Sequence, residues 1–211
     1  MPKLQPGTIG CHCGKCEITV ADNRAVQYFR CGCEDCRQGI EWGAVKKTTK
    51  PSICTVEPDQ LPHLYYIPAD IISVEGKEFL SAYKLREDGR STRLYCNQCW
   101  SLIGVDHPAY QSNVFLIFPK HCVAECDLSV PLTAILFMKD YPKDYELSPE
   151  DEVPRFYSFE YIKDTLKGGL FEVVEKELGT VLLKNLLGEG KATSYKADDG
   201  FLFLTCFFFI L

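Results

Sequence analysis

The sequence predicts a mainly β protein, and three observations support this fold class. Between Thr8 and Pro119, short segments rich in Val, Ile, Tyr and Phe alternate with turn sequences such as Glu87-Asp88-Gly89. With 46% hydrophobic and 25% charged residues, the 211-residue chain has the composition of a globular protein that can bury a core. Its 12 cysteines include three tight clusters, which indicates bound metal rather than disulfide bonds.

Eight segments of this region are expected to form strands. They are residues 17–20, 26–30, 64–67, 70–74, 79–85, 92–95, 102–106 and 114–118. No glycine-rich phosphate-binding loop follows any of them, so the sequence gives no support for nucleotide binding.

The chain divides into three predicted parts. Residues 7–139 form the zinc-binding β domain, 140–157 an acidic, Pro-containing linker, and 158–211 a C-terminal extension. Apolar residues between 158 and 187 recur at roughly helical spacing, which predicts two or three amphipathic helical segments packed on the β domain. The apolar tail, 200–211, is too short to span a membrane, and a buried strand or a membrane-surface segment would both fit it.

Charge and terminal sequence restrict the cellular setting. A formal net charge of −6 argues against a nucleic-acid partner, because phosphates would be repelled. Residues 1–10 lack the apolar stretch of a secretory signal, and no apolar run of about 20 residues predicts a transmembrane helix. We therefore expect a cytoplasmic protein whose reduced cysteines hold metal rather than form disulfides.

Three cysteine clusters have the spacing of metal ligands. They are Cys11, Cys13 and Cys16; Cys31, Cys33 and Cys36; and Cys96 and Cys99. Cysteines two or three positions apart on a tight turn can direct two thiolates at one ion, and zinc takes about four such ligands. We predict two zinc ions per chain. Two closed four-thiolate sites would be structural, whereas a site with three protein ligands would leave one position for water or substrate.

A family resemblance favours one closed and one open site. The motifs are Gly10-Cys11-His12-Cys13-Gly14, Cys31-Gly32-Cys33-Glu34-Asp35-Cys36-Arg37 and Tyr95-Cys96-Asn97-Gln98-Cys99-Trp100-Ser101, with Gly76 and Tyr83 between the last two. Together they resemble the glutathione-dependent formaldehyde-activating enzyme family, which includes the centromere protein V relatives. The resemblance covers about residues 7–118, roughly half of the chain.

The resemblance implies a β-tent fold, in which twisted antiparallel sheets are clamped by zinc. It implies a structural zinc held by Cys11, Cys13, Cys96 and Cys99, and a second zinc held by Cys31, Cys33 and Cys36 with one open position. The implied reaction condenses formaldehyde with glutathione to S-hydroxymethylglutathione, or reverses that step, so the implied class is a carbon–sulfur lyase. Arg37 follows the second cluster, and two roles fit it: pairing with a substrate carboxylate, or balancing the thiolate charge as a surface arginine.

The residues around the open site bear on its chemistry. Three thiolates make a zinc ion a weak Lewis acid that accepts a soft sulfur ligand, such as that of a small thiol, better than a hard oxygen. The sequence departs from the family pattern at Gly32, where His is usual, at Trp100, where Gly is usual, and across 38–43. These departures lie beside the open site or its support and bear on substrate identity.

Several alternatives accompany this hypothesis. Cys16 is interpreted as a buried, core-facing thiol, but as a fourth ligand of the second zinc it would close that site. Trp42 and Tyr83 could wall a pocket, although packing in the core is the simpler interpretation. The main alternative function is a zinc-stabilised binding module without catalysis, and a third is a thiol redox protein, for which no reactive cysteine outside the zinc sites stands out.

Overall fold

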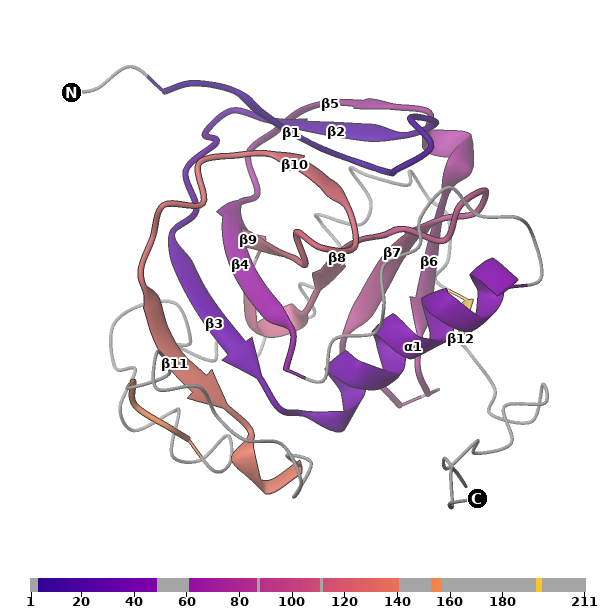
Figure 1. Ribbon diagram of the computed structural model, residues 1–211. Coiled ribbons are helices and arrows are strands. Elements are labelled where there is room, and N and C mark those ends of the chain that lie inside the picture. Colours follow the sequence, from indigo (N-terminus) through magenta and orange to yellow (C-terminus); the bar gives the residue numbers. More distant parts are fainter. Residues whose placement is uncertain are drawn as a thin grey trace, which may run out of the picture.

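The computed structural model of the chain describes residues 4–48, 61–86, 88–110, 112–140, 153–156 and 193–194. This part of the chain is mainly β (Figure 1). Its elements are β1 (Gly7–Gly10), β2 (Glu17–Val20), β3 (Gln27–Cys31), α1 (Glu34–Thr48), β4 (His63–Pro68), β5 (Ile71–Glu75), η1 (Lys77–Phe79), β6 (Leu80–Lys84), β7 (Thr92–Cys96), β8 (Leu102–Asp106), η2 (Pro108–Tyr110), β9 (Val114–Ile117), β10 (Val123–Glu125), β11 (Leu132–Leu136), η3 (Met138–Asp140) and β12 (Thr193–Ser194).

The strands form two sheets. The small sheet has the order β10-β1-β2-β5, and the large sheet has the order β11-β3-β4-β9-β8-β7-β6-β12. Neighbouring strands are antiparallel except for the pairs β11–β3 and β12–β6, which are parallel. In Figure 1 the small sheet lies across the top of the curved large sheet, and α1 runs across the front near β6 and β7.

The mainly β fold class and all eight predicted strands are confirmed, with ends that shift by at most one residue. The sequence analysis missed β1, β10 and β11, which are three to five residues long and sit at sheet positions set by their partners. It also predicted no helix between residues 8 and 119, whereas 34–48 forms α1. The predicted C-terminal helices lie outside the described residues. From the predicted linker, residues 154–156 lie beside β11 and hydrogen-bond to its backbone.

Alternating side chains give the large sheet two buried faces. On β4, Ile67 points toward the small sheet and packs in a core with Ile9 and Ile18, whereas Leu64 and Tyr66 point to the opposite face. That opposite face is covered by a second core, which includes Ile40 and Trp42 of α1, and by Phe156. The sheet is therefore buried on both sides, and a cysteine at a strand end enters one core or the other according to its register.

Helix α1 packs closely on β7 because glycines replace side chains on its inner face. A Cβ added at Gly43 would lie 3.2 Å from the Trp100 carbonyl oxygen and 3.3 Å from the Tyr95 ring. The Tyr95 hydroxyl donates a hydrogen bond of 2.7 Å to the Gly39 carbonyl oxygen. Glycine costs a helix interior about 1 kcal/mol relative to alanine, and here it permits the close approach that holds α1 on the sheet.

Candidate metal centres and cavity

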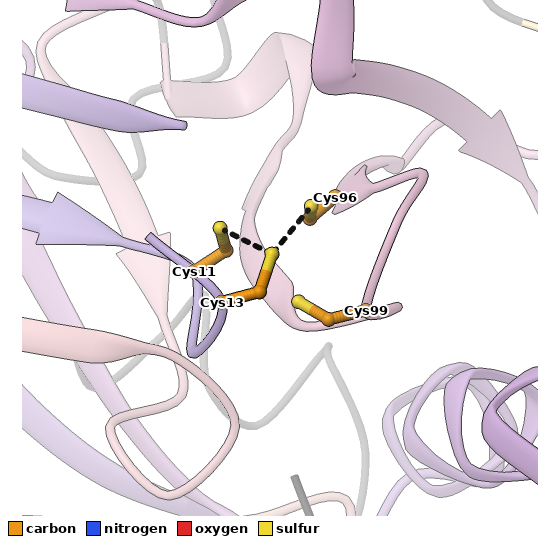
Figure 2. A group of neighbouring side chains, drawn as sticks. All are labelled: Cys11, Cys13, Cys96 and Cys99. Atoms are coloured by element: carbon orange, nitrogen blue, oxygen red, sulfur yellow. Dashed lines mark hydrogen bonds between the residues drawn. The ribbon is translucent and has the colours of Figure 1, made fainter. Parts of the chain in front are cut away.

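Four cysteines from two distant segments meet on the face of the large sheet that packs against the small sheet. Cys11 and Cys13 follow β1, Cys96 ends β7 and Cys99 lies in the turn after it. Their sulfur atoms all lie within 4.8 Å of one another, and Figure 2 shows them converging on one point. We call these residues the four-cysteine group. The structure thus brings together the ligands expected for the first site.

The spacing of these sulfurs fits a tetrahedral metal ion. With metal–sulfur bonds of about 2.3 Å, neighbouring sulfurs of a tetrahedron lie about 3.8 Å apart. The Cys11 and Cys13 sulfurs are 3.4 Å apart, and those of Cys13 and Cys96 are 3.7 Å apart, far beyond a disulfide bond. Four soft sulfur donors at this spacing could hold a metal ion with no position left for substrate.

Hydrogen bonds from neighbouring groups stabilise the thiolate form of Cys11 in the four-cysteine group. The Cys11 sulfur accepts the backbone N–H groups of Lys15, at 3.2 Å, and Cys16, at 3.3 Å. Hydrogen bonds from the Cys16, Cys96 and Cys99 thiols, together with the Cys16 backbone N–H, hold the pKa of Cys11 far below its ordinary value. A thiolate prepared in this way is a ready metal ligand.

A hydroxyl group connects this site to the adjacent turn. The Ser101 oxygen lies 3.1 Å from the Cys99 sulfur, accepts the His12 backbone N–H at 3.1 Å, and lies 2.8 Å from His12 Nδ1. Such outer contacts orient metal ligands and fix the geometry of a site. His12 therefore supports the turn between two of the cysteines.

Cys16 lies beside the four-cysteine group and not in the second one. It is 2% exposed and belongs to the same core as Cys11 and Cys96. Hydrogen bonding to the Cys11 sulfur, which prefers the neutral Cys16 thiol as a donor, is the largest influence raising the pKa of Cys16. The interpretation of Cys16 as a core-facing thiol fits this position, and Cys16 does not close the second site.

The second site lies on the opposite face of the large sheet. Cys31 ends β3, Cys33 precedes α1 and Cys36 lies in its first turn, and their sulfur atoms lie within 4.8 Å of one another. We call these residues the three-cysteine group. In the described part of the chain, no fourth His, Cys, Asp or Glu joins it at that spacing. The group could hold a metal ion with one coordination position free for another ligand.

The N-terminus of α1 stabilises the thiolate form of Cys33 in the three-cysteine group. The Cys33 sulfur accepts the Cys36 backbone N–H at 3.3 Å, as an N-cap side chain does, and Glu34 and Asp35 occupy the acidic first turn. Hydrogen bonds from the Cys31 and Cys36 thiols, and this N–H, hold the pKa of Cys33 well below its ordinary value. The positive end of the helix dipole acts in the same direction.

A cavity of about 440 Å³ opens in front of the three-cysteine group. Its walls come from strands of the large sheet, through Leu64, Val105 and Leu116, and from Phe137 after β11. All three cysteines line it. The free side of the metal position therefore faces a space large enough for a small molecule, with an apolar wall on the sheet side.

Polar groups opposite the cysteines supply hydrogen-bond donors to this cavity. The Tyr66 hydroxyl donates to the Tyr110 hydroxyl at 3.3 Å, and burial raises the pKa of both phenols, so both keep their protons. His107 Nδ1 accepts the Ala109 N–H at 3.0 Å, and burial lowers the pKa of His107 to about 4. His107 is therefore neutral at pH 7 with its proton on Nε2.

The cations of the cavity come from residues that the sequence analysis did not single out. Arg86, Arg93 and Lys139 line it, and only Arg93 is buried. Arg86 is paired with the Asp35 carboxylate at 2.7 and 3.0 Å. The spacing of these residues carries no motif, and a buried position for Arg93 could not be recognised before α1 was placed on β7.

Other predicted site residues take different positions. The Arg37 guanidinium donates from Nη1 to the Gly32 carbonyl at 2.8 Å and the Asp140 carbonyl at 2.7 Å, which ties the cysteine loop to η3. Arg37 does not line the cavity, so its contact with a substrate stays a prediction. Trp42 and Tyr83 pack with Tyr95 and Trp100 in the core rather than forming a cavity wall.

The backbone conformation of Trp100 bears on one departure from the pattern of the family that the motifs resemble. Trp100 has a left-handed backbone conformation, with φ of 56°, in the tight turn where its N–H donates to the Cys96 carbonyl. Glycine adopts this conformation without strain, which is a physical reason for glycine to be usual there. In this chain the indole packs edge-on against Trp42, with ring centroids 5.2 Å apart.

Comparison with known proteins adds no relationship to this geometry, because no family model matches the chain and no curated protein sequence matches it. The resemblance to the formaldehyde-activating family therefore depends on the quoted motifs. Within the described residues, no helix has the length and apolar character needed to cross a membrane.

Proposed function

We propose that this protein is a zinc-dependent carbon–sulfur lyase that acts on a small thiol adduct similar to S-hydroxymethylglutathione. The observation that carries the proposal is the three-cysteine group with its free side on a cavity of about 440 Å³. A closed structural site such as the four-cysteine group leaves no coordination position open, so it would not need a cavity for a further ligand. The motif resemblance, which names this reaction, agrees with the arrangement.

The proposed metals are two zinc ions with different tasks. Zinc in the four-cysteine group joins the segments that follow β1 and β7 and is structural. When zinc occupies the three-cysteine group, it stabilises the thiolate form of a fourth sulfur ligand at neutral pH. The cytoplasm, where cysteines stay reduced and small thiols are plentiful, is the compartment that suits both sites.

Side chains that line the cavity can donate a proton to the oxygen atom that changes its charge in the reaction. In the lyase direction the C–S bond of the adduct breaks, its electron pair leaves with sulfur, and the hydroxyl loses its proton as formaldehyde forms. In the reverse direction the thiolate attacks formaldehyde, and the carbonyl oxygen gains negative charge and then a proton. Tyr110, whose hydroxyl accepts from Tyr66 and keeps its own proton to donate, suits that oxygen. The Nε2–H of His107 is a second donor at the cavity.

The test measures zinc content and turnover in the same preparations. Purified protein is expected to contain two zinc ions and to accelerate exchange between formaldehyde plus glutathione and S-hydroxymethylglutathione, followed by NMR. Cys33→Ser is expected to lower the zinc content to one and abolish the acceleration. Cys126→Ser, which changes a thiol outside both groups, is the matched control and is expected to retain both.

Two results would contradict the proposal. Zinc in the three-cysteine group without acceleration for glutathione or other small thiols would favour a zinc-stabilised binding module. Full acceleration by the Cys33→Ser variant would remove the three-cysteine group from the reaction.

A further inference from the structure

We propose that Arg93 is a positioning residue that balances the charge of the metal-bound three-cysteine group and lets this group accept an anionic sulfur as its fourth ligand. The inference deepens the proposed function and rests on it for the metal and for the thiol class of ligand. It assigns to Arg93 a role in binding that can be measured without turnover.

The first argument is that Arg93 is a buried cation without an acidic partner. Its side chain is 3% exposed, and no ion pair joins it to a carboxylate in the part of the chain that the structure describes. Its Nη2 donates to the Asp35 backbone carbonyl at 2.8 Å, and its buried Nε has no hydrogen-bond partner there. A buried charge is costly unless an opposite charge lies nearby, so the site needs an anion.

The side chain of Asp35, whose backbone carbonyl Arg93 contacts, is already paired with another cation. The Asp35 carboxylate binds Arg86 through both oxygens, at 2.7 and 3.0 Å. The carbonyl that Arg93 contacts belongs to the residue just before Cys36, and Arg93 and all three cysteines line the same cavity. The thiolates of the three-cysteine group are therefore the anions that share this cavity with Arg93.

Charge balance shows why this arrangement favours a sulfur ligand. Three thiolates and one divalent ion carry a net charge of −1, which the guanidinium brings to zero. A thiolate as fourth ligand then returns the site to −1, whereas without Arg93 the same step would end at −2. Charges interact strongly in a buried site, so the guanidinium should matter much more for an anionic ligand than for a neutral one.

A glycine in α1, Gly39, leaves the space that the Arg93 guanidinium occupies. A Cβ at Gly39 would lie 2.5 Å from Arg93 Nε, closer than real Cβ atoms approach other atoms, and 3.0 Å from Arg93 Cδ, so the guanidinium would have to shift. Glycine is unfavourable in the interior of a helix, so its presence beside Arg93 is explained by the space that the guanidinium needs. Gly39→Ala is consequently a second perturbation, which displaces the guanidinium without removing its charge.

The experiment measures ligand binding to the cobalt-loaded full chain by the sulfur-to-metal charge-transfer absorption. Glutathione is the anionic probe and imidazole the neutral one. Arg93→Gln is expected to weaken glutathione binding by about tenfold or more, with imidazole affinity nearly unchanged. Arg93→Lys is expected to recover part of the loss, and Gly39→Ala to show a smaller loss of the same selectivity. Arg24→Gln, which changes an exposed arginine paired with Asp22, is the control.

Metal affinity gives an independent readout. Competition with a chelator is expected to show zinc held more weakly in the three-cysteine group of Arg93→Gln and equally well in the four-cysteine group, the internal reference. Glutathione and imidazole affinities that are both unchanged, or both reduced by the same factor, would overturn the proposal. If Arg93→Gln does not fold, the glutathione and imidazole affinities of Gly39→Ala are compared instead, and equal effects on both would overturn the proposal.

The outcomes for Arg93 and for the lyase reaction are distinguishable. Selective loss of glutathione affinity in a protein that does not accelerate adduct exchange would support the role of Arg93 and contradict the lyase. Adduct exchange in a protein whose Arg93→Gln variant binds glutathione normally would support the lyase and overturn the role of Arg93.

Discussion

The cross-link made by the four-cysteine group should supply a large share of the stability of the fold. Cys13 and Cys96, whose sulfurs lie 3.7 Å apart, are separated by 83 residues in the chain. A metal ion joining them closes a loop of that length in the unfolded chain. We predict that replacing Cys96 and Cys99 together with serine, which removes one side of the link, destabilises the protein strongly.

The expected magnitude follows from loop closure. For a loop of this length, the chain-entropy relation gives about 4.5 kcal/mol at 25 °C. Domains of ordinary size are stable by roughly 5–15 kcal/mol, so this loss would be a major part of the total. The three-cysteine group differs, because its ligands are two and three positions apart. By the same relation, removing it should cost only about 2 kcal/mol, since it closes very little chain.

Equilibrium denaturation in reducing, zinc-containing buffer tests this difference. The matched comparison is the Cys96→Ser/Cys99→Ser variant against Cys33→Ser, because serine at position 33 can still cap α1. Chelator treatment of the unsubstituted protein should reproduce most of the larger loss. If the double variant lost no more free energy of unfolding than Cys33→Ser, the structural role of the four-cysteine group would be refuted.

Three further predictions concern single residues. Asp106 is 1% exposed, no ion pair joins its carboxylate to a cation among the described residues, and burial, partly offset by the His107 backbone N–H, raises its pKa from 3.8 to about 7. The unfolded chain ionises first, so this group's contribution to stability should fall by roughly 4 kcal/mol as pH rises from about 4 to 7. Asp106→Asn, measured as the difference from the parent protein across that range, should lack this decline; parallel pH profiles would contradict the assignment. Tyr110→Phe should lower kcat for adduct cleavage by about tenfold with KM nearly unchanged, and an unchanged kcat would exclude its hydroxyl from the reaction. Trp100→Gly should destabilise the protein by about 2 kcal/mol in thermal denaturation, because lost indole packing exceeds the relief of backbone strain; a more stable variant would show the reverse balance.

The sequence predicted best those features that depend only on residues close together in the chain. The strand from 102 to 106 and the one from 17 to 20 were placed at their observed ends, because apolar, β-branched runs between turn signals are local features. Ligand spacing likewise identified the three cysteine clusters, and the motif resemblance implied that Cys11 and Cys13 join Cys96 and Cys99, as the structure places them. Neither inference required knowledge of what packs against these segments.

Features that depend on tertiary packing were not predictable. Helix α1 carries Gly39 and Gly43 in its interior, which weakens any helical signal, and it is stabilised by contact with β7 and by the cap at Cys33. The burial of Arg93 and the pairing of the Tyr66 and Tyr110 hydroxyls follow from that packing. The large sheet also separates the two cysteine groups onto opposite faces, a consequence of strand register that cluster spacing does not contain.

The most direct test of the open site is X-ray absorption at the zinc edge of protein loaded with two zinc ions. Four sulfurs in one group and three in the other predict an average of three and a half sulfur ligands per zinc, with a light atom completing the second site. Addition of glutathione should raise the average to four. An average of four sulfurs before any thiol is added, or no change after it, would contradict an open zinc site that binds a thiol.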